Sequence, residues 1–413
     1  MNSIFDILLK AGADADALKT AYAIGVPFLI SALLGWLFVP RVLLISRKKK
    51  LYDIPDARKV HNRPIPRLGG ITFFPVLLMS FCLTIGIWML MGLYGGLPRV
   101  NVFIARFIML AVGMMTLYLT GVADDLIGVS YKAKFLVQIV CASLFPLSGL
   151  WIYDLSGLFW LHQIPAFVGI PLTIFIVVYI TNAINLIDGV DGLASGLCSI
   201  ALFTLGMASA IKAQYLFCMI SFGMLGVLLP FWFYNVFGNA EKGKKIFMGD
   251  TGSLTLGYLL SFLLVYMGSL DKMGFPRGML LMGFSTMIIP LMDIPRVMLA
   301  RIRDGRNPFT PDKNHIHHKL MRAGMKPIWT MATLLAVTVF LIAFTVLCVM
   351  LDIDKTLILL IDIALGIILH LTIDRFIARK YDDMATVAKM KHIVPEYKSN
   401  NSIYEKLDKK DAN

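Results

Sequence analysis

Long apolar runs separated by short polar segments dominate the chain between residues 21 and 374. A helix needs about 20 apolar residues to cross roughly 30 Å of hydrocarbon. Eleven runs approach this length, over about residues 21–39, 71–93, 102–123, 135–153, 164–180, 193–211, 215–237, 253–270, 279–299, 330–350 and 356–374. None alternates apolar and polar residues as a membrane β-strand would. The pattern predicts an all-α, polytopic membrane protein with about 11 transmembrane helices.

Composition agrees with this prediction. Hydrophobic residues make up 58% of the 413 residues and charged residues 16%, whereas soluble domains are about 45–50% apolar and about 25% charged. A soluble or disordered chain is therefore excluded. We expect one transmembrane domain over residues 1–377, followed by a tail over residues 378–413 that carries mixed charge.

The basic residues predict the orientation in the membrane. Of the 39 Lys and Arg residues, 30 fall on the side that holds the segment between the first two runs, and seven fall on the other side. Because cytoplasmic loops carry the excess of Lys and Arg, the first side is predicted to be cytoplasmic. The N-terminus is then outside and the C-terminus inside. No basic patch is interleaved with stacking aromatic residues, so a nucleic acid is not an expected partner.

Carboxylates gather in the predicted cytoplasmic segments, beginning with Asp124 and Asp125 at the end of the third run. Adjacent carboxylates repel, so one should have a raised pKa unless a cation lies between them. Acidic residues at a helix C-terminus also oppose the helix dipole. Lys134 follows ten residues after Asp124. A role in binding Mg²⁺ or in proton transfer explains the pair better than a solvated helix end.

Two further acidic motifs follow. Asn182, Asn185, Asp188 and Asp191 recur at every third position, which would place them on one face if this segment were helical. Their oxygens are the ligands that Mg²⁺ prefers. Asp250 precedes the eighth run, where it could bind a metal or simply cap a helix.

The most basic segments suggest phosphate binding. Residues 52–70 combine prolines with Lys and Arg, among them Lys59, and basic groups on a stiff loop suit a phosphate or diphosphate. The segment after the ninth run contains candidate substrate-binding residues, namely Arg301, Arg303, His315, His317 and His318. Zinc binding by the histidines is less favoured, because no cysteine or fourth ligand is nearby. Asp293 and Arg296 are expected to pair with each other.

Taken together, the motifs resemble those of a known enzyme family. DxPDxRKxHxxPxPRxGG, GxxDD, NxxNxxDGxDGL, GDTGS and HIHH occur in order over about residues 51–320. They are similar to those of the polyprenyl-phosphate N-acetylhexosamine-1-phosphate transferases (glycosyltransferase family 4). The number of runs and the HIHH motif look like the bacterial undecaprenyl-phosphate GlcNAc-1-phosphate transferase branch.

The resemblance implies transfer of a sugar 1-phosphate from a UDP-N-acetylhexosamine to undecaprenyl phosphate, with release of UMP, at the cytoplasmic face of a bacterial inner membrane. It implies catalytic roles for Asp124, Asp125, Asp188 and Asp191. By the same resemblance, Asp250 and Asn185 would hold Mg²⁺ or Mn²⁺. Lys59, Lys134, Asn182 and the arginines and histidines named above would contact phosphate or sugar. Whether the chain forms a homodimer is left open.

The main alternative is a cation-coupled membrane transporter. Such a protein would place its carboxylates near the bilayer midplane, on broken helices. Here they lie in loops and at predicted inner helix ends, and no inverted repeat is evident. The sequence therefore favours the transferase.

Overall fold

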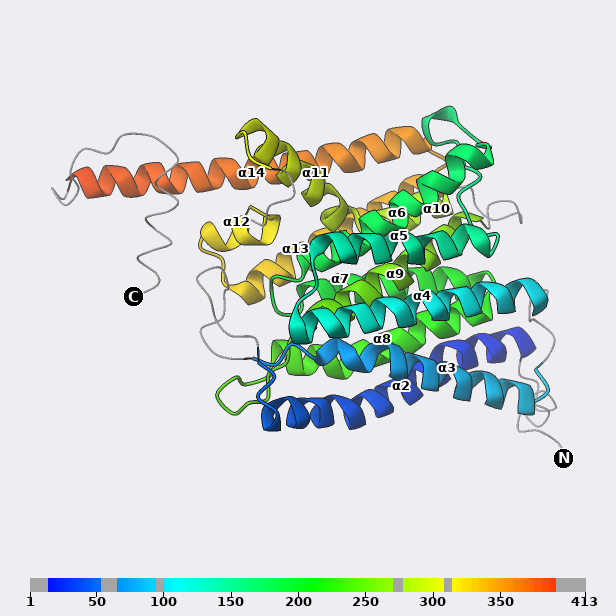
Figure 1. Ribbon diagram of the computed structural model, residues 1–413. Helices are drawn as coiled ribbons and strands as arrows, with labels where there is room; N and C mark the ends of the chain where they lie inside the picture. The colour runs from blue at the N-terminus through cyan, green and yellow to red at the C-terminus, as the bar shows by residue number, and fades with distance from the viewer. Residues whose placement is uncertain (1–13, 53–64, 94–99, 270–277, 308–313, 391–413) are drawn as a thin grey trace.

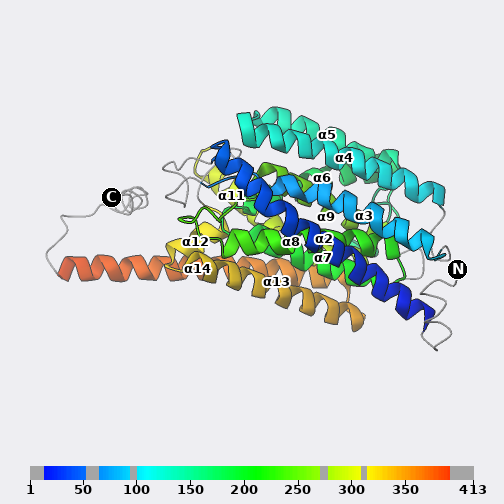
Figure 2. The ribbon, with the colours of Figure 1, turned by 90° about the horizontal axis from the view of Figure 1, so that it is seen from below.

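The computed structural model describes residues 14–52, 65–93, 100–269, 278–307 and 314–390, and its regular elements there are all helical. The long helices lie side by side along one common direction (Figures 1 and 2). The helices are α2 (Ala15–Lys48), η1 (Gly69–Thr72), α3 (Phe73–Leu90), α4 (Val100–Ile127), α5 (Tyr131–Leu147), η2 (Leu158–Trp160), α6 (Ala166–Ile187), α7 (Leu193–Ile211), α8 (Tyr215–Val236), α9 (Gly249–Ser269), α10 (Met279–Ser285), α11 (Ile288–Arg303), α12 (Ile316–Arg322), α13 (Pro327–Met350) and α14 (Lys355–Met390). The all-α prediction is confirmed.

The described residues contain nine helices that are long and apolar enough to span a membrane, and a tenth if α10 and α11 form one broken span. These two helices meet at an angle of 67°. Pro290 lies in the first turn of α11, where its missing N–H costs no helical hydrogen bond, so a new helix can begin there. α5 has 17 residues and is shorter than the helices counted. The count of 11 stays a prediction.

The centre of the bundle is α9, whose apolar stretch is entirely buried. Close approach to its neighbours depends on small residues. A Cβ at Gly121 of α4 would lie 2.4 Å from the Cα of Thr251, and one at Gly257 would lie 2.6 Å from the Cα of Thr181 on α6. Small residues allow helices to pack at this distance in membranes. α4 and α6 are thereby held on two sides of α9, and both end at the same end of the bundle as its N-terminus.

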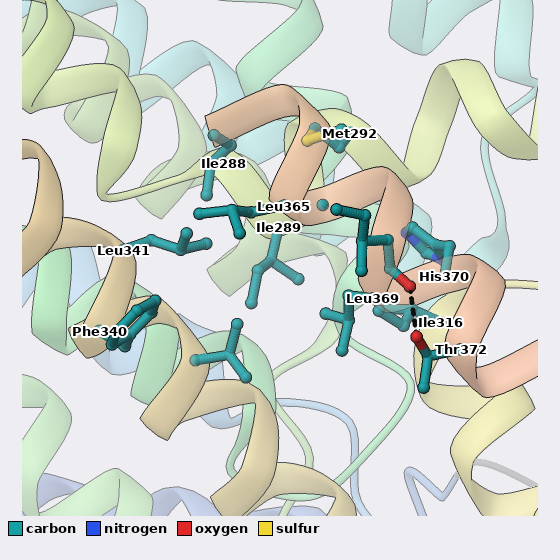
Figure 3. Close-up of a pocket in the computed structure, with 13 residues that line it drawn as sticks. Ile288, Ile289, Met292, Ile316, Phe340, Leu341, Leu365, Leu369, His370 and Thr372 are labelled. Carbon is teal, nitrogen blue, oxygen red and sulfur yellow. Dashed lines mark hydrogen bonds between the residues drawn. The ribbon is translucent and has the colours of Figure 1, made fainter. Parts of the chain in front are cut away.

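An apolar cavity of about 310 Å³ lies between α11, α13 and α14 (Figure 3). Ile288, Phe340, Leu365 and Ile316 at the start of α12 are among its lining residues. It contains none of the residues predicted to act on a substrate, so the candidate chemistry must be sought elsewhere.

The polar motifs meet at one end of the bundle. The α4–α5 turn, the α6–α7 turn, the α8–α9 loop and α12 all lie at the left in Figure 1, whereas α2 begins at the opposite end. α14 leaves the bundle on the same side as the motifs and continues as a helix beyond Ile377 to Met390. The start of α2 and the end of α14 thus lie at opposite ends of the bundle.

Cysteine labelling tests the predicted orientation. In a background without the five native cysteines, an Asn314→Cys variant should resist a membrane-impermeant thiol reagent added to intact cells. A Lys212→Cys variant, in the α7–α8 turn at the other end of the bundle, should react with it and serves as the matched control. Labelling of position 314 from outside, with position 212 protected, would reverse the assigned sidedness.

Candidate functional site

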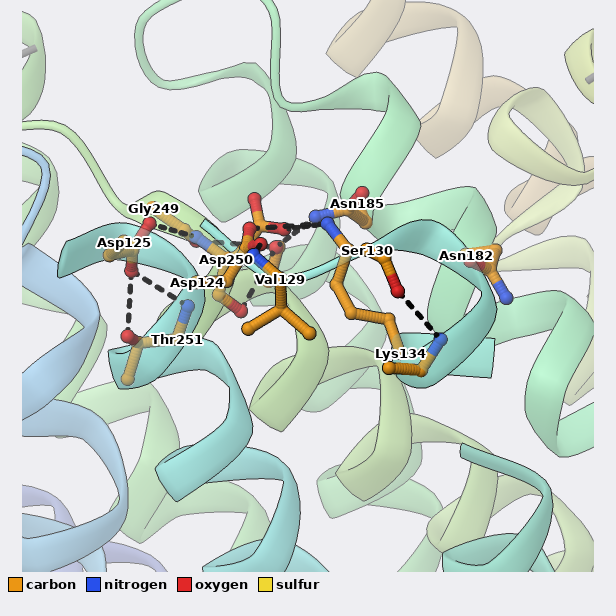
Figure 4. A network of polar contacts seen from close by, with 12 residues as sticks. Asp124, Asp125, Val129, Ser130, Lys134, Asn182, Asn185, Gly249, Asp250 and Thr251 are labelled. Atoms are coloured by element: carbon orange, nitrogen blue, oxygen red, sulfur yellow. Dashed lines mark hydrogen bonds and ion pairs between the residues drawn. The ribbon is translucent and has the colours of Figure 1, made fainter. Parts of the chain in front are cut away.

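A lysine joins two carboxylates from different helices at the motif end of the bundle (Figure 4). Lys134, in the first turn of α5, places its Nζ 3.1 Å from Asp124 Oδ2 and 2.9 Å from Asp250 Oδ2. The other oxygen of Asp124 accepts the backbone N–H of Val129 at 2.6 Å. The repulsion expected between acidic groups at this end of α4 is therefore offset by a cation and an N–H group. The arrangement ties α4, α5 and α9 together.

Asp125 turns away from Asp124 and caps the N-terminus of α9. Its Oδ1 accepts the N–H of Asp250 at 2.9 Å, and its Oδ2 accepts the N–H and hydroxyl of Thr251 at 3.0 and 2.7 Å. The first N–H groups of a helix have no partner within the helix. Asp125 supplies that partner from α4, so Asp250 remains free of the capping role that the sequence alone allowed it.

The α6–α7 segment departs from the helical arrangement considered for it. α6 ends at Ile187, so Asn182 and Asn185 lie on the helix whereas Asp188 and Asp191 lie beyond it. A single helical face for all four is wrong, because the Asp-Gly-Val-Asp-Gly sequence forms a turn there instead. The Asn182 amide donates to Gln138 Oε1 of α5 at 2.5 Å, and the Asn185 amide donates to Ser253 Oγ of α9 at 2.8 Å.

The two aspartates of this turn have different surroundings. Asp191 Oδ2 pairs with Lys245 Nζ at 2.6 Å. Asp188 receives no hydrogen bond from the described residues, and burial, followed by the nearby Asp250 carboxylate, raises the pKa of Asp188 to about 8. The Arg67 guanidinium opposes this shift. Asp188 therefore favours its protonated form beside the neighbouring carboxylates, and the described Arg67 opposes this only in part.

The end of the first basic segment packs along the α8–α9 loop. Gly69 and Gly70 donate their N–H groups to the carbonyls of Phe247 and Met248, both at 2.9 Å. A Cβ at Gly70 would lie 2.1 Å from the N of Gly252, so only glycine fits between these segments.

This pairing brings Arg67 close enough to act electrostatically on Asp188 and Asp250. In the sequence, Arg67 is one of several basic residues within residues 52–70. Its position immediately before the Leu-Gly-Gly contact was the signal that could have distinguished it. Lys59 lies outside the described residues.

The histidines form a second part of the site. His317 is 1% exposed, and a Cβ at Gly189 would lie 2.4 Å from its Nε2, so its imidazole lies directly against the α6–α7 turn. Burial, followed by the neighbouring His318 and His315, holds the pKa of His317 well below its usual value. The ring centroids of His317 and His318 are 4.3 Å apart. The structure therefore brings HIHH and DGxDG together, although more than 120 residues separate them.

The two predicted arginines lie at the end of α11. Arg301 is buried, whereas the Arg303 side chain is 87% exposed and its Nε lies 4.0 Å from Asp304 Oδ1. Asp293 and Arg296 pair at 2.8 Å as expected, but that expectation was incomplete, because Asp293 also contacts His315 at 2.7 Å.

Among the residues described, no group of three or more His, Cys, Asp or Glu side chains is arranged to hold a metal ion. The oxygens of Asp250, Asp188 and Asn185 are of the type that Mg²⁺ prefers. Lys134 now contacts Asp250, and it would have to yield part of that carboxylate to a cation. The donor chemistry fits a hard divalent ion, and the metal site stays a prediction.

Comparison with known proteins identifies the family. Residues 107–268, from within α4 to the end of α9, match the model of glycosyl transferase family 4. A Bacillus subtilis protein named as a probable undecaprenyl-phosphate N-acetylglucosaminyl 1-phosphate transferase is 33% identical over 306 residues, covering 73% of this chain and 78% of the relative. The chain belongs to glycosyl transferase family 4. The resemblance inferred from the motifs is confirmed.

Other members of the family are similar over comparable lengths. The undecaprenyl-phosphate alpha-N-acetylglucosaminyl 1-phosphate transferase of Escherichia coli K12 is 30% identical over 285 residues, which is 68% of this chain and 71% of the relative. The protein of that name from Yersinia pestis is 30% identical over 296 residues, which is 70% of this chain and 74% of the relative. The region matched by the glycosyl transferase family 4 model contains Asp124, Asp188 and Asp250.

Neighbouring aspartates should differ in what their loss does to stability. Asp125→Ala leaves the N–H groups of Asp250 and Thr251 without their acceptor, and should cost about 2 kcal/mol of stability. Asp124→Ala should cost less, because Lys134 keeps Asp250 as a partner. Thermal unfolding of the two purified variants in one detergent measures the difference. Equal losses of stability would show that Asp125 is not the cap on which α9 depends.

Proposed function

We propose that the protein transfers GlcNAc-1-phosphate from UDP-GlcNAc to undecaprenyl phosphate, giving undecaprenyl-diphosphate-GlcNAc and UMP. Membership of the family and the names of its relatives support this reaction. The observation that carries it in the molecule is the junction of Asp124, Lys134 and Asp250, with Asp188 close to it, at the end of a membrane bundle. The chain is not a transporter.

The position of the charged cluster supports a lipid substrate. It lies where α4, α6 and α9 meet the polar loops, so a lipid phosphate held at the bilayer surface and a soluble nucleotide could both reach it. The excess of basic residues on that side supports a cytoplasmic site in a bacterial inner membrane.

The chemistry requires mainly neutralisation of charge and in-line positioning. Lys134 and Arg67 bring positive charge to the cluster, and Asp124 and Asp250 hold Lys134 in place. Asp250, Asp188 and Asn185 are the residues that would hold Mg²⁺, which would neutralise the diphosphate when bound. His317, packed on Gly189, would close the side of the α6–α7 turn.

The assay that tests the proposal measures UMP released from UDP-GlcNAc by the purified protein in detergent with Mg²⁺. Release should require undecaprenyl phosphate, and the lipid product should carry the labelled sugar. A panel of other UDP-sugars in the same assay identifies the preferred substrate. No UMP release with any UDP-sugar in the presence of acceptor would refute the proposed function.

We favour direct attack by the lipid phosphate over a two-step route. An oxygen of the lipid phosphate would form a bond to the sugar-bearing phosphorus of the UDP-sugar. The bond between that phosphorus and the bridging oxygen would break, and UMP would leave with the bonding pair. A lipid phosphate is already largely ionised at neutral pH, with a second pKa near about 6 by analogy with phosphoserine, so it needs little help from a base.

Incubation with labelled UDP-GlcNAc and Mg²⁺ but no acceptor should give no stoichiometric UMP. Label retained on Asp124 or Asp125 would establish a two-step route instead.

Asp250→Asn keeps the size of the side chain but removes its charge. We expect a fall in rate of about 100-fold or more, because one member of the charged cluster that stabilises the transition state is lost. The rate should be measured across a series of Mg²⁺ concentrations. Near-normal activity of this variant at limiting Mg²⁺ would show that Asp250 does not bind the metal.

A further inference from the structure

Asp293 is a buried carboxylate outside the cluster of α4, α5 and α9. It lies on α11 and is 1% exposed. Its Oδ1 accepts the backbone N–H of Ile316 at 3.1 Å and the Nε and Nη2 of Arg296 at 3.2 and 2.8 Å. Its Oδ2 lies 2.7 Å from Nδ1 of His315. A buried charge is costly unless it is paired and fully hydrogen-bonded, and Asp293 meets both conditions by binding the start of α12.

The contacts divide between the two oxygens of the carboxylate. Oδ1 faces groups that can only donate, namely a backbone N–H and a guanidinium. Among the described residues, Oδ2 contacts an imidazole nitrogen of His315, which can donate or accept according to its tautomer. Because a carboxylate can only accept, Asp293 fixes the proton of His315 on Nδ1. The Nε2 of His315 makes no hydrogen bond with the described residues.

The contact also sets the position of the next histidine. The rings of His315 and His317 are stacked, with centroids 5.9 Å apart and planes 4° from parallel. His317 in turn lies on Gly189, between Asp188 and Asp191. Asp293 therefore holds one end of a continuous contact that leads from α11 through two histidines to the acidic turn of the site.

We propose that Asp293 is a positioning residue for the transfer reaction: it holds His315 with Nδ1 protonated, so that Nε2 is presented to the UDP-sugar. This inference rests on the proposed function. His315 is the group that contacts the substrate, and Asp293 acts only through it. Arg296 balances the charge of Asp293 and also donates to the backbone carbonyl of Asn314.

Asp293→Asn separates tautomer control from structural support. The amide oxygen of asparagine would replace Oδ1, since Ile316 and Arg296 can only donate there. The NH₂ group would then face His315 and force Nδ1 to accept, which moves the ring proton to Nε2. The variant keeps the anchor of α12 and reverses the tautomer. In the catalytic triad of serine proteases, a wrong tautomer costs about 10⁴-fold. Here the histidine is not the base that activates the nucleophile, so we expect a smaller loss, of about 10²-fold in kcat.

A double-mutant cycle in the UMP-release assay tests the proposal. Asp293→Asn and His315→Ala should each lower kcat by about 10²-fold, and the double variant should be no more than about threefold slower than either. The Tm of Asp293→Asn should stay within a few degrees of the wild-type value. Near-normal kcat in Asp293→Asn would overturn the proposal, and so would losses that multiply in the double variant.

Two further variants guard against a purely structural effect. Asp374→Asn is the matched control. Asp374 of α14 pairs with Lys319 of α12, with 2.6 Å between Oδ1 and Nζ. Loss of this ion pair should change kcat by less than about twofold. His315→Asn keeps an N–H donor for Asp293 but has no Nε2, and should be as slow as His315→Ala even if Asp293→Asn does not fold. A His315→Asn enzyme with wild-type kcat would overturn the proposal. An inactive wild-type protein would instead refute the proposed function and this inference with it.

Discussion

The hydrogen bonds between Asp125 and the N-terminus of α9 are the contact on which the site depends. α9 is the buried centre of the bundle, and Gly249 and Thr251 at its start are buried. Buried backbone donors without partners are costly in a membrane protein. Because Asp125 satisfies two of them, α9 can begin at Gly249 beside the end of α4. That start places Asp250 one residue into the helix, with its carboxylate free to meet Lys134.

The same device holds the second part of the site. Asp293 accepts the N–H of Ile316 at the start of α12, as Asp125 accepts that of Thr251 at the start of α9. In both places a carboxylate on one helix caps the start of another helix. Each cap also places the side chain next to it: Asp250 in the first case and His315 in the second. Structural carboxylates thus position the functional groups around the α6–α7 turn.

The sequence was sufficient to predict the all-α class, the family and most of the polar groups that meet, because hydrophobic run length and motif order are local signals. It could not predict which carboxylates are structural. The Asp125–Thr251 contact spans 126 residues, and nothing in an Asp-Asp pair tells which member caps a helix. The break between α10 and α11 was missed because one predominantly apolar run, over residues 279–292, continues across it. The end of α6 was not predicted, because the polar residues of NxxNxxDGxD keep a helical spacing past Ile187, where the helix ends.

Charge balance around the α6–α7 turn explains how these parts could work together. Asp125 is satisfied by N–H and hydroxyl groups, and Asp191 is paired with Lys245. Asp124 and Asp250 both pair with Lys134, and among the described residues the Arg67 guanidinium opposes the effect of burial on Asp188. Among the described residues, the carboxylates of this cluster outnumber its basic side chains, Lys134 and Arg67. If the substrate is a UDP-sugar, the proposed Mg²⁺ would offset the repulsion between these carboxylates and the diphosphate. Asp250, Asp188 and Asn185 would then hold that ion, and the carboxylates that oppose a bare diphosphate would favour the metal-bound one.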